Sequence, residues 1–212
     1  GELEAFEYAS TLAHAPARFP VQFVVRPMTE AYHDYRGYAG KISSGTFNVG
    51  DVIRVLPTGQ ESTIATIEKF ETKLSHAIAG DSVTITLTTD IDISRGNTVV
   101  LASEVQPPQL KDFSAQVCWL DHTALSPGKT YLLQHGIHTT KAKISQITAR
   151  LDVATQSATE GVSTLQLNEI GTIALRTAQP ISADQYAANP ANGAFILIDE
   201  FSNSTVGVGF VN

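Results

Sequence analysis

The chain has 212 residues, 42% of them hydrophobic and 17% charged, which excludes a disordered chain because a sizeable core can be filled. Its 14 basic and 21 acidic residues give a net charge of −7, and this argues against sequence-independent binding of nucleic acid. No apolar run approaches the ~20 residues of a membrane-spanning helix, and the single cysteine, Cys118, is consistent with a cytoplasmic location.

Residues 1–19 differ in pattern from the rest of the chain. Apolar side chains recur at roughly helical spacing between Leu3 and Leu12, among good helix formers, which predicts a short helix. Pro16 and Pro20 then indicate a stiff linker, because proline fixes its own backbone torsion. We therefore expect residues 1–19 to form a helix and a linker.

The remaining chain has the pattern of short β-strands. Residues 82–88 alternate apolar and polar side chains throughout, as a half-buried strand requires. Residues 115–119 and 172–175 alternate in the same way. Near the end of the sequence, Gly207 and Gly209 share one face of a further strand, where we expect them to let a neighbouring backbone approach closely.

Turn signals separate these runs at regular intervals. Each combines a glycine with polar residues or a proline, which favours tight turns. The turn glycines are Gly45, Gly50, Gly59, Gly80, Gly96 and Gly128. Short strands at this spacing predict a closed or sandwiched antiparallel sheet, and closure into a barrel leaves no free sheet edge.

Two consecutive prolines, Pro107 and Pro108, provide the best internal boundary. Neither can continue a central strand, and together they stiffen a connector. The sequence therefore predicts an all-β protein with two units, residues 20–106 and residues 107–212, after the segment 1–19.

The tripeptide Gly128-Lys129-Thr130 ends like a phosphate-binding loop of the form G-x-x-x-x-G-K-[ST]. The first glycine of that motif should stand at position 123, which is Thr123. Pro127 also lacks an N–H where the loop needs one. A turn that leads into a strand is the better interpretation.

Two histidines raise the question of a metal site. His135 and His138 are three positions apart, so in one continuous strand they point to opposite faces and cannot share a metal ion. A tight turn at Gly136 would bring them together, but no third ligand is evident. An Asp-x-x-Gly pattern at residues 34–37 resembles one that GTP-binding proteins use near the metal. Without an upstream phosphate loop, we interpret it as a loop that feeds a strand.

The loop of residues 90–96 carries Asp90, Asp92 and Arg95. Alternating aspartates could bind a divalent cation, but a loop in which Arg95 pairs with a carboxylate is the stronger interpretation. No Gly-x-Ser-x-Gly elbow and no convincing acid–base pair is present. The sequence therefore predicts no catalytic, cofactor-binding or metal-ligating residue in this chain.

Several segments together resemble domains two and three of translational GTPases, the two β-barrels that follow the nucleotide-binding domain in elongation factor Tu. Residues 37–53 resemble a glycine-rich segment that ends in Gly-Asp before a strand. Residues 79–83 and 92–96 resemble the patterns A-G-[DE]-x-V and I-x-R-G, and residues 204–211 resemble the closing strand T-V-G-x-G-x-V. The resemblance implies two consecutive small antiparallel β-barrels, one domain 2-like and one domain 3-like.

Within that superfamily the chain is similar to the GTP-hydrolysing subunit of bacterial sulfate adenylyltransferase. The segments that carry this similarity are residues 19–27, 34–40, 56–62, 90–96, 125–128, 186–190 and 196–203. Two departures are Gln185, where that family tends to carry arginine, and an insertion that contains His33. Any contact that depends on the arginine would be missing here.

The similarity implies a role in sulfate assimilation. In that family the large subunit hydrolyses GTP and drives a small catalytic subunit, which joins ATP and sulfate into adenosine 5′-phosphosulfate and pyrophosphate. GTP and Mg²⁺ would then belong to a domain upstream of residue 1, and the Leu3–Leu12 segment would be its last helix. Because this chain has neither a phosphate loop nor an Asn-Lys-x-Asp motif, we expect that it neither binds nor hydrolyses GTP.

Arg36 and Arg95, near loop ends, are the candidate contacts with the upstream domain or the small subunit. Pairing with a local carboxylate is an equally good role for each. The alternative function is an elongation-factor-like module that holds tRNA or a ribosomal surface. Only fold-level analogy supports it, and the net charge of −7 without a basic stripe opposes it. A freestanding barrel with a small ligand is a third interpretation, and the helix-like segment at residues 1–13 argues against it.

Overall fold

The computed structural model describes residues 12–26, 35–70 and 72–212. The insertion around His33 lies outside these residues, as does the predicted helix apart from its last residue, Leu12. Strands make up 56% of the structure, and every strand pairing in the described part is antiparallel. Among the described residues, no helix is long and apolar enough to cross a membrane. The predicted all-β class is confirmed.

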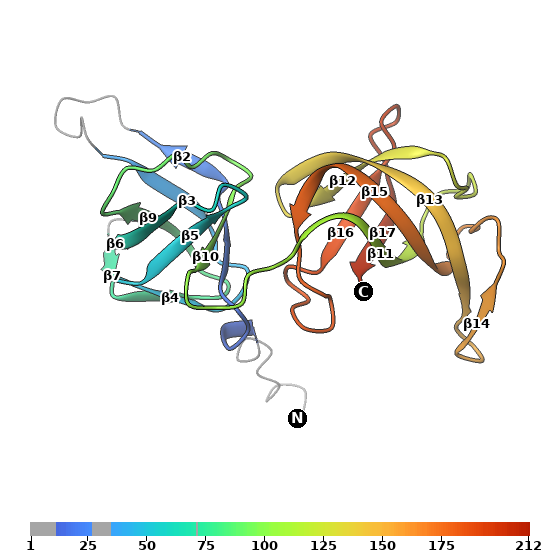
Figure 1. Ribbon diagram of the computed structural model, residues 1–212, viewed down its shortest axis with the longest axis horizontal. Helices are drawn as coiled ribbons and strands as arrows, with labels where there is room; N and C mark the ends of the chain where they lie inside the picture. The colour runs from blue at the N-terminus through green and yellow to red at the C-terminus, as the bar shows by residue number, and fades with distance from the viewer. Residues whose placement is uncertain (1–11, 27–34, 71) are drawn as a thin grey trace. The chain divides into compact units, whose positions relative to one another are not determined.

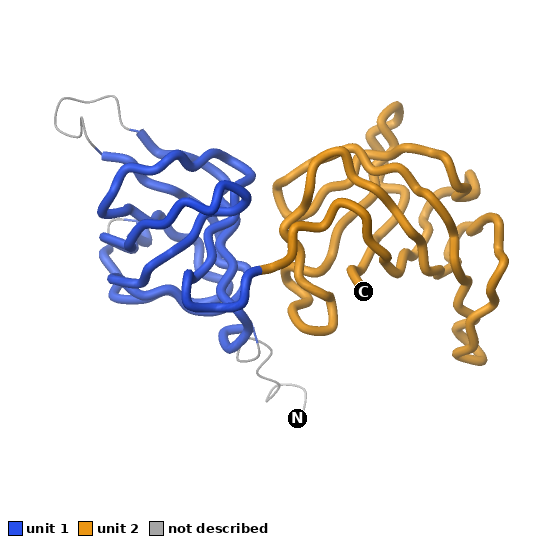
Figure 2. Tube along the Cα trace, in the orientation of Figure 1, with its two compact units in different colours: residues 1–106 blue, residues 107–212 orange. Residues whose placement is uncertain are grey.

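The chain divides into two compact units, Gly1–Gln106 and Pro107–Asn212 (Figure 2). Each unit has its own apolar core. The connector between their sheets includes Pro107 and Pro108, which have no N–H to donate to a neighbouring strand. The two units are therefore described separately.

Ten short strands form the described part of the first unit (Figure 1). They are β1 (Arg18–Pro20), β2 (Phe23–Val25), β3 (Gly37–Lys41), β4 (Thr46–Asn48), β5 (Val52–Leu56), β6 (Glu61–Lys69), β7 (Thr72–Leu74), β8 (His76–Ile78), β9 (Ser82–Leu87) and β10 (Thr98–Leu101). The main sheet has the order β1-β10-β5-β6-β9-β3-β2, with β7 on β6, and β4 pairs with β8.

One stretch of chain closes this sheet into a barrel. Its first part, β1, pairs with β10, and its second part, β2, pairs with β3. Between them the Val21 N–H donates to Asn97 O at 2.9 Å, and the Gln22 N–H donates to a β3 carbonyl at 2.9 Å. Gly40 permits this closure, because a Cβ there would clash with the carbonyl oxygen of Pro20.

Three turns of the first barrel share one arrangement. An aspartate or asparagine side chain accepts the N–H of the residue three positions earlier, and a glycine with positive φ precedes it. The three bonds join Asn48 to Asp51 (2.7 Å), Ile78 to Asp81 (3.1 Å) and Ser94 to Asn97 (2.8 Å). The preceding glycines, Gly50, Gly80 and Gly96, have φ of 93°, 97° and 95°. The side chain thus closes the turn, and glycine supplies a backbone conformation that other residues rarely adopt.

Seven strands form the second unit. They are β11 (Gln109–Trp119), β12 (Thr130–His135), β13 (His138–Asp152), β14 (Ser157–Glu160), β15 (Ile170–Ser182), β16 (Ala194–Ile198) and β17 (Thr205–Val211). The order β12-β16-β17-β11-β15-β13 returns to its start because β12 also pairs with β13, and β14 pairs with β13 outside this ring. The result is a closed six-stranded barrel.

Aromatic side chains fill the second barrel beside β17. A Cβ on Gly209 would overlap the ring of Phe195, and a Cβ on Gly207 would lie 3.3 Å from the ring of Trp119. Trp119 in turn packs edge-on against Tyr131, with ring centroids 5.5 Å apart. Gly209 therefore makes room for an aromatic ring rather than for a neighbouring backbone, and for this glycine the sequence prediction was wrong. A Cβ on Gly207 would also lie 3.5 Å from the backbone oxygen of Cys118.

The other sequence-predicted strands are present in the structure. Residues 82–88, 115–119 and 172–175 fall in β9, β11 and β15, with β9 ending one residue early. Residues 18 and 19 were expected to belong to a linker, but they lie in β1 of the first barrel, which begins at Arg18. The prolines suggested a linker, but a strand tolerates proline where no ladder N–H is needed.

Candidate partner-contact residues

Arg36 lies directly before β3. Its guanidinium forms ion pairs with Asp90 and Asp92, the second at 3.5 Å between Nη2 and Oδ1. The Arg36 side chain is 17% exposed, whereas the two aspartates are 74% and 88% exposed. Because solvent screens the carboxylates, each pair contributes less than about 1 kcal/mol to folding.

The same arginine lies over an aromatic ring. Its Cζ is 5.7 Å from the centroid of Tyr38, and the Tyr38 hydroxyl donates to Ile91 O at 3.1 Å. Tyr35, on the other side of Arg36, donates to Glu68 Oε2 at 2.9 Å. Burial, together with this hydrogen bond, raises the pKa of Tyr35 to about 12, so the phenol stays protonated. These contacts hold the residues before and at the start of β3 to β6 and to the loop that follows β9.

Arg95 is exposed and forms no ion pair with any residue that the structure describes. The interpretation that Arg95 holds a carboxylate of its own loop was wrong, because Arg36 pairs with both Asp90 and Asp92. Strand pairing explains the difference: β3 lies beside β9, so the residue before β3 reaches the loop that follows β9. A role in partner contact stays a prediction for both arginines.

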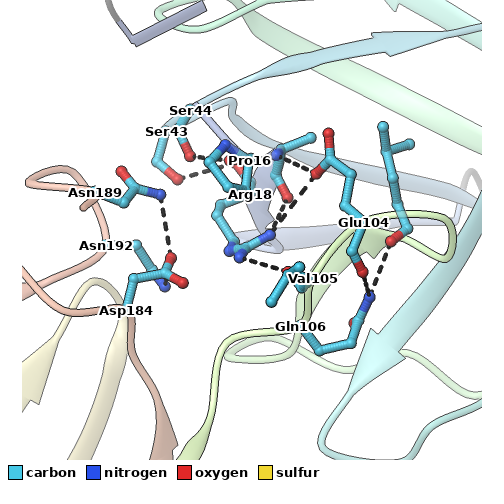
Figure 3. Close-up of polar contacts among 12 residues, drawn as sticks. Pro16, Arg18, Ser43, Ser44, Glu104, Val105, Gln106, Asp184, Asn189 and Asn192 are labelled. Carbon is cyan, nitrogen blue, oxygen red and sulfur yellow. Dashed lines mark hydrogen bonds and ion pairs between the residues drawn. The ribbon is translucent and has the colours of Figure 1, made fainter. Parts of the chain in front are cut away.

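A second arginine, Arg18, is 1% exposed at the start of β1. Its Nη1 donates to Ala17 O at 3.0 Å and its Nη2 donates to Val105 O at 3.0 Å (Figure 3). Glu104 Oε2 accepts the Ala17 N–H at 2.6 Å and lies 3.9 Å from Arg18 Nη1. The residues that lead into the first barrel therefore meet those that lead out of it.

Two further polar side chains hold this region. Ser44 Oγ donates to Pro16 O at 2.6 Å, and Gln106 Nε2 donates to the carbonyl two residues before it at 2.8 Å. We name residues 16–18 and 104–106 together the connector corner. It combines a buried cation, a carboxylate and hydrogen-bonded backbone from both ends of the first unit.

No local pattern points to the connector corner in the sequence. Arg18 stands alone between two prolines, and its acceptor Val105 follows 87 positions later. The one available signal is that an apolar residue, Ala17 or Phe19, stands on each side of the arginine, as in a short strand with alternating side chains. Both apolar residues are fully buried in the structure.

In the second unit, buried amides fix the loop that follows β15. Asn192 Nδ2 donates to Asp184 Oδ2 at 2.9 Å, and Asn189 Nδ2 donates to the same oxygen at 3.1 Å (Figure 3). His135 Nε2 lies 2.9 Å from Asn192 O, and since a carbonyl only accepts, this nitrogen carries the proton. Gln185, the position where arginine was expected, is exposed in this loop.

His135 and His138 are direct partners across the turn between β12 and β13. Opposite residues of an antiparallel pair share a face, so the structure shows the alternative with a tight turn at Gly136 and not one continuous strand with the histidines on opposite faces. The turn at Gly136, with φ of 56°, is the reason. Burial lowers the pKa of both imidazoles. In the described part of the chain, no group of three or more His, Cys, Asp or Glu residues could hold a metal ion.

Gly128 does not offer a phosphate cradle. Its N–H donates to Ile144 O at 2.8 Å, and the Ile144 N–H donates to Lys129 O at 3.0 Å. Residues 127 and 128 form a turn that leads into β12, as the sequence interpretation had it, and the two bonds join the end of this turn to Ile144 of β13. Of the Asp-x-x-Gly pattern, Asp34 lies outside the described residues and Gly37 begins β3.

The polar groups of both units therefore act on backbone segments. Arg36, Arg18 and Asp184 each fix a loop or a strand end through hydrogen bonds or ion pairs. Cys118 is a free thiol, half-buried in β11 between β15 and β17.

Comparison with solved structures shows the fold. The chain superimposes on crystal structures of sup35 complexed with GMPPNP and with GDP, with TM-scores of 0.83 and 0.80 and 19% identity. The superpositions cover 99% and 95% of this chain, and 50% and 48% of those chains. Residues 112–212 match the family model described as GTP-eEF1A C-terminal domain-like.

Sequence comparison identifies nearer relatives. The bifunctional enzyme CysN/CysC of Mycobacterium tuberculosis (strain ATCC 25618 / H37Rv) is 40% identical over 195 residues, which are 92% of this chain and 32% of that protein. Sulfate adenylyltransferase subunit 1 of Cellvibrio japonicus is 39% identical over 209 residues, which are 99% of this chain and 43% of that protein. The chain thus spans less than half the length of these curated relatives. By sequence it is a homologue of the sulfate adenylyltransferase subunit 1 proteins, with the double β-barrel of the elongation-factor-like GTPases.

Proposed function

We propose that this chain is the non-catalytic barrel region of a GTP-hydrolysing subunit of sulfate adenylyltransferase. In this role it relays the nucleotide state of an upstream domain to a small catalytic subunit, which joins ATP and sulfate. The observation that carries the proposal is the 39% identity to a sulfate adenylyltransferase subunit 1 across 99% of this chain. The ordered loops around Arg36 and the connector corner support a scaffolding role over a catalytic one.

Partner binding is the direct test. The purified 212-residue chain is immobilised, and a purified small subunit of a bacterial sulfate adenylyltransferase is passed over it, with an unrelated barrel protein as the control surface. We expect the small subunit to bind this chain saturably and not to bind the control surface. Binding of tRNA in a parallel channel, without binding of the small subunit, would favour the elongation-factor-like alternative instead.

GTP and Mg²⁺ belong, in this proposal, to a domain outside the chain, which acts in the cytoplasm. At the nearest match to a phosphate loop, the Gly128 N–H donates to Ile144 O of β13, and Pro127 precedes this glycine. We expect no change in the fluorescence anisotropy of a labelled GTP analogue when the chain is added with Mg²⁺. A micromolar affinity, competed by unlabelled GTP, would contradict the proposal.

A further inference from the structure

We propose that Arg18 is a positioning residue that locks the connector between the two units onto the first barrel. Residues 16–18 and 104–106 then behave as one body. This inference concerns the chain itself and does not depend on which partner the chain binds.

The geometry of the guanidinium is the first argument. Its two terminal nitrogens donate to carbonyls from segments far apart in the sequence, Ala17 O at 3.0 Å and Val105 O at 3.0 Å. A planar fork with donors fixed at both ends can bridge two such acceptors, whereas the point-like ammonium of lysine cannot match this arrangement. The hydrogen bond to Val105 O joins the connector to β1.

Burial is the second argument. A guanidinium that is 1% exposed must satisfy its donors within the protein, because an unpaired buried cation is strongly unfavourable. Glu104 lies 3.9 Å from Nη1, and its carboxylate is occupied at 2.6 Å by the Ala17 N–H. Arg18, from residues 16–18, therefore binds the backbone of Val105, and Glu104, from residues 104–106, binds the backbone of Ala17. The two contacts join the same two segments in opposite directions.

The weakness of the connector elsewhere is the third argument. Between Leu101, the end of β10, and Gln109, the start of β11, no described strand holds the chain. Two ties are local: the Glu104 N–H donates to Leu101 O at 3.3 Å, and Gln106 Nε2 donates to the same carbonyl at 3.0 Å. A third bond, from the Ala102 N–H to Val52 O at 2.9 Å, holds the start of the connector to β5. None of these bonds attaches the connector to β1, so the attachment depends on Arg18 and Glu104.

Limited proteolysis of the whole chain tests this inference. A glutamate-specific protease cuts after Glu104 only when the connector opens, and cleavage after Glu61, in β6 of the same barrel, reports general unfolding. In Arg18→Gln we expect cleavage after Glu104, relative to Glu61, to rise about tenfold or more, since local opening controls the rate. Arg18→Lys should give a smaller rise, because one ammonium cannot replace both donors.

The matched control is Lys69→Gln, which removes an ion pair on the barrel surface. Lys69 pairs with Asp81 at 2.7 Å and has no bond to the connector corner or to Glu61. We expect this variant to leave cleavage after Glu104 unchanged. An unchanged Glu104-to-Glu61 ratio in both Arg18 variants overturns the proposal. An equal rise at both sites also overturns it, because Arg18 would then stabilise the barrel as a whole.

Discussion

Gly209 shows how closely side chains pack inside the second barrel. A Cβ at this position would overlap the Phe195 ring, whereas one at Gly207, on the same face of β17, would only touch Trp119 at 3.3 Å. We expect Gly209→Ala to lower the free energy of unfolding by about 3 kcal/mol and Gly207→Ala by about 1 kcal/mol, as overpacked cores do.

Urea denaturation followed by tryptophan fluorescence measures both variants. Trp119 is the only tryptophan of the chain and lies in the core of the second barrel, so its signal isolates that unit. Equal stability of the two variants would show that Phe195 moves aside at little cost, against the packing argument.

Arg95 offers the cleaner test of the predicted contacts with a partner. It is exposed and unpaired within the described chain, so Arg95→Ala should change the free energy of unfolding by less than about 0.5 kcal/mol. A tenfold or greater loss of affinity for the small subunit, on the order of 1.4 kcal/mol, would then report a direct contact.

Arg36→Ala needs its stability measured in parallel, because it also releases Asp90 and Asp92. Unchanged affinity in both variants would remove these arginines from the interface.

At the scale of elements, we expect the histidines of the β12–β13 hairpin to make the stability of the second barrel depend on pH between pH 8 and pH 5. Burial lowers the pKa of His135 and of His138, so the folded state keeps both rings neutral at a pH where the unfolded chain, with pKa about 6.5, takes up protons. The free energy of unfolding should therefore be highest above pH 6.5. It should fall as the pH drops from 6.5 to the lowered pKa of the folded state.

The midpoint of urea denaturation between pH 8 and pH 5, read from Trp119, checks this prediction. His135→Gln can keep an N–H donor toward Asn192 O but cannot titrate, so its midpoint should fall less over this range. His138→Gln isolates the less buried ring. If the wild type and both variants lose stability in parallel, the histidines are not the source of the pH dependence.

At the scale of the whole molecule, each unit has what a folded domain requires. The second barrel closes on itself through β12 and has a separate core, to which none of the described residues of the first unit belongs. We expect a polypeptide of residues 107–212 to fold by itself. Its tryptophan emission and cooperative urea transition should match those of the full chain, whereas a red-shifted emission without a transition would contradict this.

Several strands, the turns and the boundary between the units were readable from the sequence, since each depends on local chemistry. Alternation predicted β9, the second half of β11 and four residues of β15, and the turn glycines all have the positive φ that their positions required. Pro107 and Pro108 stand where the structure divides into two units. The glycine–aspartate pairs, which supported the family resemblance, close turns through bonds between neighbouring residues.

What the sequence did not determine were the contacts that strand pairing creates between distant residues. The sequence favoured an ion pair between Arg95 and a carboxylate of its own loop, but the pairing of β3 with β9 places Arg36 beside Asp90 and Asp92 instead. The turn at Gly136 put two histidines on one face, and barrel closure brought Arg18 to Val105, 87 positions away. Local periodicity fixes which residues form a strand and which face they share, whereas register and closure decide which strands become neighbours.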